Sequence, residues 1–135
     1  MFATDAVSPH KGGIALVWRT SPTWSLESER THGPNIIRFE LKTGHRRFLI
    51  VGAYISPSEE DGSTFDYIKQ ACNRQTGLCT IVMGDFHVDI VDPGATGRDA
   101  EILAGLAGLG VTNAGENFHL SRRHCDGFTW KQCHN

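Results

Sequence analysis

The 135-residue sequence lacks any long apolar run, and this absence limits what the chain can be. No stretch approaches the roughly 18 apolar residues that a membrane span needs, so no membrane partner is expected. Residues 1–13 have no apolar core of the kind that secretory signals carry. We therefore expect an intracellular protein with no signal peptide.

The sequence is also short of cysteine and of charge of a single sign. Four cysteines are too few for a disulfide scaffold at this length, which favours reduced thiols. Thirteen basic and fifteen acidic residues give a formal net charge of -2. This balance excludes a polycation that coats nucleic acid along its whole length, although local basic patches remain possible. With 39% hydrophobic and 21% charged residues, the composition is that of a globular domain.

Short apolar segments indicate β-strands. Runs rich in β-formers predict buried strands at residues 13–18, 48–55 and 80–83, and partial alternation predicts another strand at residues 36–41. The turn signal at residues 42–45 lies between two of these strands. Those two strands are therefore expected to form a β-hairpin.

Two further segments have apolar side chains at helical spacing. One helix is expected to begin at Ser63, where Asp66 completes a capping box. The other is expected over residues 98–109, with Gly110 as a left-handed C-cap. Strands and helices in this order indicate an α/β fold, in which helices pack outside mostly buried strands.

Two strand ends carry side chains that are suited to chemistry. Asp85 follows the predicted strand at residues 80–83, and Gly84 before it allows a sharp backbone turn. A carboxylate there can orient a water, act as a base or help to hold a metal, but it can also simply form an Asx turn. Tyr54 ends another predicted strand. Its hydroxyl can donate to a phosphate oxygen, or it can belong to a core tyrosine with its hydroxyl at the rim.

Basic pairs and a group of histidines and cysteines admit both functional and structural interpretations. Arg46 with Arg47, and Arg122 with Arg123, can contact backbone phosphates or lie in solvated turns. The histidines and cysteines near the end of the sequence are zinc-ligand types, but no Cys-x-x-Cys pair anchors them, so no metal site is expected there. They are His119, His124, Cys125, Cys133 and His134.

Four sequence blocks, taken in order, resemble the endonuclease/exonuclease/phosphatase superfamily. They are Lys-Gly-Gly-Ile-Ala-Leu-Val-Trp-Arg from residue 11, Gly-Ala-Tyr-Ile-Ser-Pro from residue 52, Ile-Val-Met-Gly-Asp-Phe-His from residue 81 and Asp-Gly-Phe-Thr-Trp from residue 126. Within that superfamily, the sequence is most similar to the endonuclease domain of non-LTR retrotransposon (reverse-transcriptase) polyproteins. This similarity lies in Gly-Arg-Asp at residues 97–99, followed by Leu-Gly-Val-Thr-Asn at residues 109–113. The resemblance implies a four-layer α/β/β/α sandwich and metal-dependent hydrolysis of a phosphoester.

The resemblance also implies roles for three residues. Tyr54 matches the tyrosine that contacts the scissile phosphate, and Asp85 matches the aspartate that positions or deprotonates the attacking water. His87 stands where the family usually has an asparagine that hydrogen-bonds the phosphate. The same resemblance implies DNA as substrate, Mg²⁺ or Mn²⁺ as cofactor, the remainder of a retroelement polyprotein as partner, and a nuclear location.

The family's metal-ligating glutamate and its Ser-Asp-His block have no counterpart in the sequence. We therefore expect residues 1–135 to be a single, truncated domain of this type, a partial sandwich with a weak metal site. Two functions follow: an incomplete endonuclease, or an inactive remnant that acts as a weak nucleic-acid or protein interaction module. Marginal stability is also expected, because missing strands leave sheet edges and an apolar face uncovered.

Overall fold

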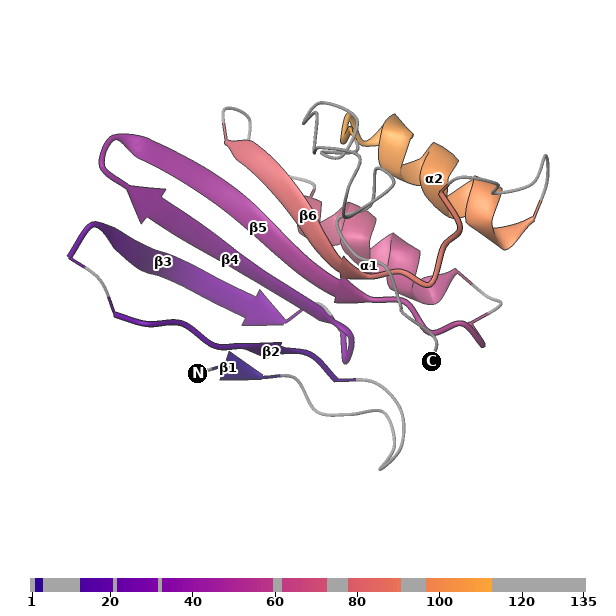
Figure 1. The fold of residues 1–135 in the computed structure, drawn as a ribbon, viewed down its shortest axis with the longest axis horizontal. Coiled ribbons are helices and arrows are strands. Elements are labelled where there is room, and N and C mark those ends of the chain that lie inside the picture. Colours follow the sequence, from indigo (N-terminus) through magenta and orange to yellow (C-terminus); the bar gives the residue numbers. More distant parts are fainter. Residues whose placement is uncertain are drawn as a thin grey trace, which may run out of the picture.

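The protein has a mixed α/β fold with a four-stranded sheet and two helices, which confirms the predicted α/β class (Figure 1). The computed structural model describes residues 2–3, 13–20, 22–31, 33–59, 62–72, 78–90 and 97–112. In spatial order, the sheet contains β3 (Trp24–Thr31), β4 (Ile36–Thr43), β5 (Arg46–Tyr54) and β6 (Cys79–Asp85). A separate two-stranded sheet pairs β1 (Phe2–Ala3) with β2 (Ala15–Leu16), and the helices are α1 (Ser63–Cys72) and α2 (Arg98–Gly108).

The predicted hairpin is confirmed. β4 and β5 are antiparallel with Thr43 opposite Arg46, so that only Gly44 and His45 form the loop. The φ of 56° at Gly44 provides the positive torsion that two-residue hairpin loops need. β5 then pairs in parallel with β6 across α1. The C-terminal ends of β5 and β6 therefore lie at the same edge of the sheet (Figure 1).

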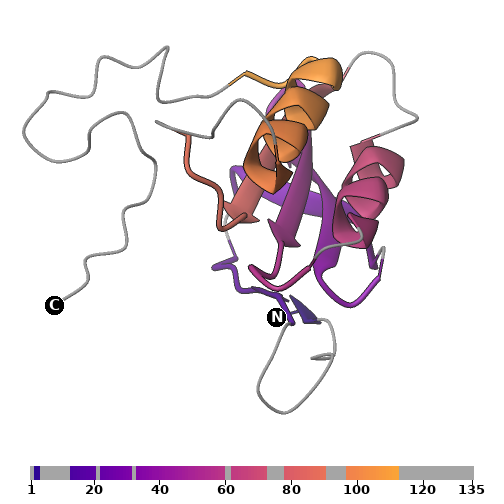
Figure 2. The same cartoon turned by 90° about the vertical axis from the view of Figure 1, so that its right-hand side faces the viewer.

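The main core lies between one face of the sheet and the two helices (Figure 2). Phe65 and Ile68 on α1 are buried there, as their spacing predicted, and Ile102 of α2 is also buried. Gly105 of α2 lies so close to Phe65 that a Cβ would come within 2.2 Å of the ring. The buried members of this core are Ile36, Leu49, Val51, Ala53, Ile55, Phe65, Ile68, Ala71 and Ile102.

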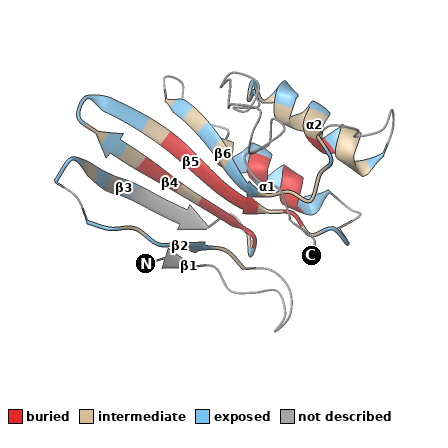
Figure 3. Cartoon of the chain, in the orientation of Figure 1, coloured by how far each residue is buried: buried red, intermediate tan, exposed pale blue. Residues whose placement is uncertain are grey.

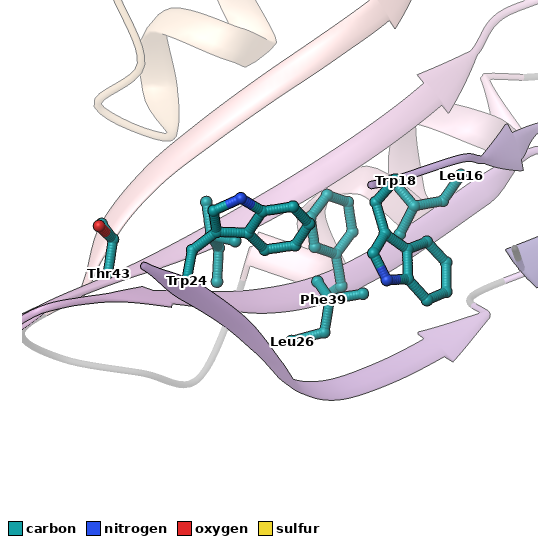
Figure 4. A pocket seen from close by; sticks show the side chains of 7 residues that line it. Leu16, Trp18, Trp24, Leu26, Phe39 and Thr43 are labelled. Carbon is teal, nitrogen blue, oxygen red and sulfur yellow. The ribbon is translucent and has the colours of Figure 1, made fainter. Parts of the chain in front are cut away.

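The opposite face of the sheet is also apolar, but the described residues cover it only in part. Ile37, Phe39 and Ile50 are buried on this face, and Ile14 and Leu16 from the β2 segment pack against them. A pocket of about 340 Å³ opens beside them, and its walls include aromatic side chains from β3 and from the segment after β2 (Figure 4). It is lined by Leu16, Trp18, Trp24, Leu26, Phe39, Leu41 and Thr43.

Two strands that the sequence predicted to be buried are largely exposed (Figure 3). Within residues 13–18 only β2 forms, with Ala15 exposed, and the following Val17 is 73% exposed. β6 forms as predicted but lies at the edge of the four-stranded sheet, where Ile81 and Met83 remain 40% and 55% exposed. The prediction failed because burial depends on a strand's place in the sheet, which its composition does not reveal.

α1 begins at Ser63 as predicted, but a carboxylate from the preceding turn serves its first turn. Glu59 Oε1 accepts the backbone N–H of Thr64 at 2.6 Å, and Glu59 Oε2 accepts the Thr64 hydroxyl. Asp66, which was expected to complete the capping box, pairs with Lys69 Nζ at 3.0 Å. A carboxylate at this end of a helix also interacts favourably with the helix dipole.

α2 ends in the left-handed cap that the sequence predicted. Gly110 has a φ of 73°, and its N–H donates to the carbonyl of Ala107 at 2.9 Å. The N–H of Val111 donates to the carbonyl of Leu106 at 3.3 Å, which completes a Schellman motif. Among the described residues, no helix combines the length and apolar character that crossing a bilayer requires.

Candidate functional site

Parallel pairing of β5 and β6 brings Tyr54 and Asp85 together. They are register partners and the last residues of their strands. The N–H of Ile55 donates to the Asp85 carbonyl at 2.9 Å, which extends the ladder one residue further. On the other side, the N–H of Tyr54 donates to the carbonyl of Asn35 at 3.0 Å. The backbone of Tyr54 is therefore fixed from both neighbouring segments.

Gly84 allows the two strands to approach at this point. Its φ is 152°, and a Cβ built on it would lie 1.7 Å from the carbonyl oxygen of Ala53 on β5. Any side chain at position 84 would collide with the backbone of the neighbouring strand. The predicted sharp turn at Gly84 is wrong, because the strand continues through Asp85. Glycine is needed here because of the close approach to β5.

His87 faces Asp85 through both its backbone and its ring. Its N–H donates to Asp85 Oδ1 at 3.2 Å, and its Nε2 lies 3.2 Å from Asp85 Oδ2. The His87 ring also meets the Tyr54 ring edge to face, with centroids 5.6 Å apart and an interplanar angle of 84°. The side chains of His87 and Asp85 are 28% and 38% exposed, so the cluster is open to solvent on one side.

The hydrogen bonds of Asp85 fit both interpretations of this residue, an Asx turn and a role in chemistry. Acceptance of the N–H two residues further on is the Asx-turn contact that a strand-end aspartate was expected to make. Each carboxylate oxygen has two lone pairs, so one bond to His87 leaves each oxygen able to accept a second hydrogen bond. Asp85 can therefore hold the turn and still orient a water.

The segment after β6 explains why His87 turns towards the site. Phe86 and Val88 pack against the main core on either side of His87, whose own backbone is not extended. His87 has a φ of 46°, in the left-handed region that few residues other than glycine adopt. Such a backbone costs on the order of 1–3 kcal/mol, so it persists only where the surrounding contacts hold it in place.

Arg98, the first residue of α2, supplies part of that support, and it was not predicted from the sequence. Its Nη1 donates to the His87 carbonyl at 2.8 Å, and its Nη2 donates to the Phe86 carbonyl at 3.2 Å and the Ser56 carbonyl at 3.1 Å. The carboxylate of Asp99 accepts a further bond from Nη1 at 3.1 Å. The only available signal was the place of this arginine in the Gly-Arg-Asp start of the predicted helix.

The cluster does not by itself form a magnesium or manganese site. It supplies one carboxylate, Asp85, and both oxygens of that carboxylate already contact His87. No three His, Cys, Asp or Glu side chains converge anywhere in the described part of the chain. Because magnesium is held by one or two carboxylates together with substrate phosphates and waters, Asp85 could supply only part of its ligands.

Of the predicted basic contacts, Arg46 and Arg47 are described, and they lie away from this cluster. Arg46 and Arg47 begin β5, whereas Tyr54 ends it, so the two ends are roughly 26 Å apart along an extended strand. Arg47 Nη2 also lies 2.7 Å from a Glu40 oxygen and 3.0 Å from a Glu27 oxygen, so its charge is compensated. Arg122 and Arg123, the histidine and cysteine group, and the Asp-Gly-Phe-Thr-Trp block lie outside the described residues.

No protein-family model and no curated protein matches this sequence. The family assignment is therefore a proposal that rests on the sequence blocks and on the geometry of Tyr54, Asp85 and His87.

Proposed function

We propose that the chain carries the phosphate-facing part of a metal-dependent phosphodiester hydrolase, an endonuclease domain of retroelement type that is incomplete as this chain. One observation carries the proposal: Tyr54 and Asp85 end adjacent parallel strands, and His87 contacts both of them. DNA is the proposed substrate, the remainder of a retroelement polyprotein is the proposed partner, and the nucleus is the proposed location.

Each residue of the cluster has a distinct proposed role. Asp85 accepts a proton or a hydrogen bond from the attacking water, and the Tyr54 hydroxyl donates to a phosphate oxygen. Because His87 Nε2 faces Asp85, only Nδ1 remains for the substrate. A protonated ring donates from Nδ1 to phosphate, whereas a neutral ring that donates from Nε2 has only a lone pair at Nδ1. His87 can therefore donate to the phosphate only when Nδ1 carries a proton.

We also propose the four-layer α/β/β/α sandwich for the complete domain. The partly covered apolar face of the sheet supports it, because such a face is normally buried against another layer. Leu16 of β2 and Ile14 before it already pack on that face. In this proposal the Mg²⁺ or Mn²⁺ ion, when bound, stabilises negative charge on the phosphate, and residues outside the described part contribute its ligands.

The second candidate function is an inactive remnant that acts as a weak nucleic-acid or protein interaction module. The single carboxylate of the cluster favours it, because Asp85 cannot fix a divalent ion without further ligands. Such a module would retain contacts to phosphate through Tyr54 and His87 but would not hydrolyse the diester.

Nicking of supercoiled plasmid by the purified 135-residue chain, with Mg²⁺ or Mn²⁺, separates the two functions. We expect Asp85→Asn to lower the nicking rate by about 100-fold or more, the usual contribution of a positioned acid–base group. Asp66→Asn is the matched control, because Asp66 is an exposed carboxylate on α1 that pairs only with Lys69 among the described residues. Equal nicking by wild type and Asp85→Asn would refute the hydrolase proposal. No nicking by folded wild type would favour the inactive remnant or show that this chain needs its missing parts.

His87→Asn tests the departure from the family in the same assay. The amide restores the donor and acceptor of the family's asparagine, so this variant should nick or bind DNA at least as well as the wild type. Fluorescence anisotropy with a labelled duplex then identifies the inactive module. Binding that Tyr54→Phe weakens, in the absence of any nicking, would support that second function.

A further inference from the structure

Arg98 connects two loops that are far apart in the sequence. Its guanidinium donates to the carbonyl of Ser56 after β5, 42 residues away, and to the carbonyl of Phe86 after β6, 12 residues away. A third bond reaches the carbonyl of His87 itself. These loops directly follow Tyr54 and Asp85, so one side chain ties the ends of both strands to the start of α2.

The bonding pattern requires a guanidinium. The side chain of Arg98 is only 27% exposed, and its two terminal nitrogens donate in separate directions, with two acceptors each. Its Nε is buried and makes no hydrogen bond within the described part of the chain. A lysine ammonium is a single point donor on a flexible stem, so it cannot reach the two loops at once.

The helix that carries Arg98 is itself fixed. Ile102, one turn further on, is buried in the main core. Asp99 accepts the N–H of Asp89 at 3.0 Å with Oδ2, while its Oδ1 accepts a bond from Arg98. The start of α2 therefore has a defined position relative to the sheet, and Arg98 transmits this position to the two loops.

We propose that Arg98 is a positioning residue of the Tyr54–Asp85–His87 cluster, which holds the left-handed backbone of His87 through its carbonyl. Without that bond, His87 returns to a negative φ, and its ring leaves Asp85 and Tyr54. The effect on hydrolysis rests on the proposed function. The effect on the position of the ring does not.

The test measures the His87 ring directly, by histidine side-chain NMR on the full chain, with the His87 signals assigned from their absence in His87→Asn. The ring contact with Tyr54 should give His87 a ring-current shift in the wild type. Arg98→Lys should move the His87 signals and leave those of the other six histidines in place. General destabilisation would instead broaden or shift all seven. If Arg98→Lys does not fold, Arg98→Gln, whose amide still donates to one loop, replaces it.

Arg38→Lys is the matched control, because Arg38 is also a largely buried arginine with an unpartnered buried Nε among the described residues. It pairs with Glu40 on β4 and touches neither loop. We expect it to lower stability comparably while the His87 signals stay unchanged. His87 signals that are unchanged in folded Arg98→Lys, or moved equally by Arg38→Lys, would overturn the positioning role.

The nicking assay adds the catalytic consequence. Displacement of the ring by about 1 Å predicts a fall in the maximal nicking rate of roughly 10- to 100-fold, with a smaller change in the DNA concentration at half-maximal rate. If the His87 signals move but no variant nicks DNA, the positioning role holds and hydrolysis by this chain alone is refuted. If wild type nicks DNA and Arg98→Lys nicks it equally fast, the positioning role fails and the hydrolase proposal stands.

Discussion

Replacing Gly84 by alanine should destabilise the protein strongly, and it should do so at the cluster. The added Cβ would lie 1.7 Å from the carbonyl oxygen of Ala53 and 2.8 Å from its carbonyl carbon. Both are backbone atoms, which no rotamer change can move. Relief requires β5 and β6 to separate by about 1.3 Å, since Cβ atoms essentially never approach closer than 3.0 Å.

Three costs add up at this position. Alanine at a φ of 152° is strained, forced overpacking typically costs about 1–3 kcal/mol, and each disrupted ladder hydrogen bond costs about 1 kcal/mol. Together they predict a loss of about 3–5 kcal/mol, a large part of the roughly 5–15 kcal/mol that stabilises a typical domain. Because Tyr54 and Asp85 directly follow Ala53 and Gly84 in the register, the same separation would pull them apart.

Two alanine substitutions elsewhere isolate these costs. Gly44 has a φ of 56°, and no atom lies within 4 Å of the place that a Cβ would take, so Gly44→Ala should cost only the backbone strain, about 1 kcal/mol. Gly108 lies in α2 in open space, so Gly108→Ala should stabilise the protein by about 0.5 kcal/mol. Urea unfolding followed by circular dichroism measures all three variants. A loss at Gly84 no larger than the loss at Gly44 would refute the steric argument.

Three further outcomes are expected. Glu59→Ala should lower the free energy of unfolding by about 1 kcal/mol, because α1 loses the acceptor at its N-terminus. Thermal unfolding of this variant beside Glu59→Gln, which keeps a side-chain acceptor, measures the loss. Burial raises the pKa of the Cys72 thiol above its ordinary 9.0, although the nearby charge of Arg38 acts in the opposite direction. Iodoacetamide should therefore alkylate the exposed Cys79 before Cys72. Peptide mapping that shows equal rates at the two cysteines would contradict this. The contribution of Cys72 to folding stability is present below the pKa of this thiol in the unfolded chain, and it is lost as pH rises through its pKa in the folded protein. Met83→Lys should reduce aggregation in light scattering and change stability by no more than about 0.5 kcal/mol.

Local sequence signals predicted the elements whose geometry is set by neighbours in the chain. The turn at Gly44 set the hairpin register, the spacing of Phe65 and Ile68 identified the inner face of α1, and Gly110 marked the end of α2. Each of these depends on contacts within a few residues, which a single sequence records directly.

The features that the sequence did not reveal depend on partners far along the chain. The exposure of Met83, for example, follows from the place of β6 at the sheet edge. Arg98 acts through carbonyls, which every residue possesses, so no side-chain pattern points to its partners. Only the β5–α1–β6 topology places Ser56 beside Phe86 and makes one arginine able to serve both loops.

The backbone of His87 gives a physical account of which residues can occupy that position. At a φ of 46°, most side chains are disfavoured, and asparagine and histidine are among the few that adopt the left-handed region more readily. The family resemblance implies that histidine replaces asparagine at this position. This replacement would preserve the loop, the Asx turn at Asp85 and the carbonyl that Arg98 bonds. What changes is the chemistry at the tip of the side chain, where a neutral amide is replaced by a ring whose donor depends on its protonation. The conformation restricts the choice of residue, and the choice of histidine changes which side-chain atoms can contact a phosphate.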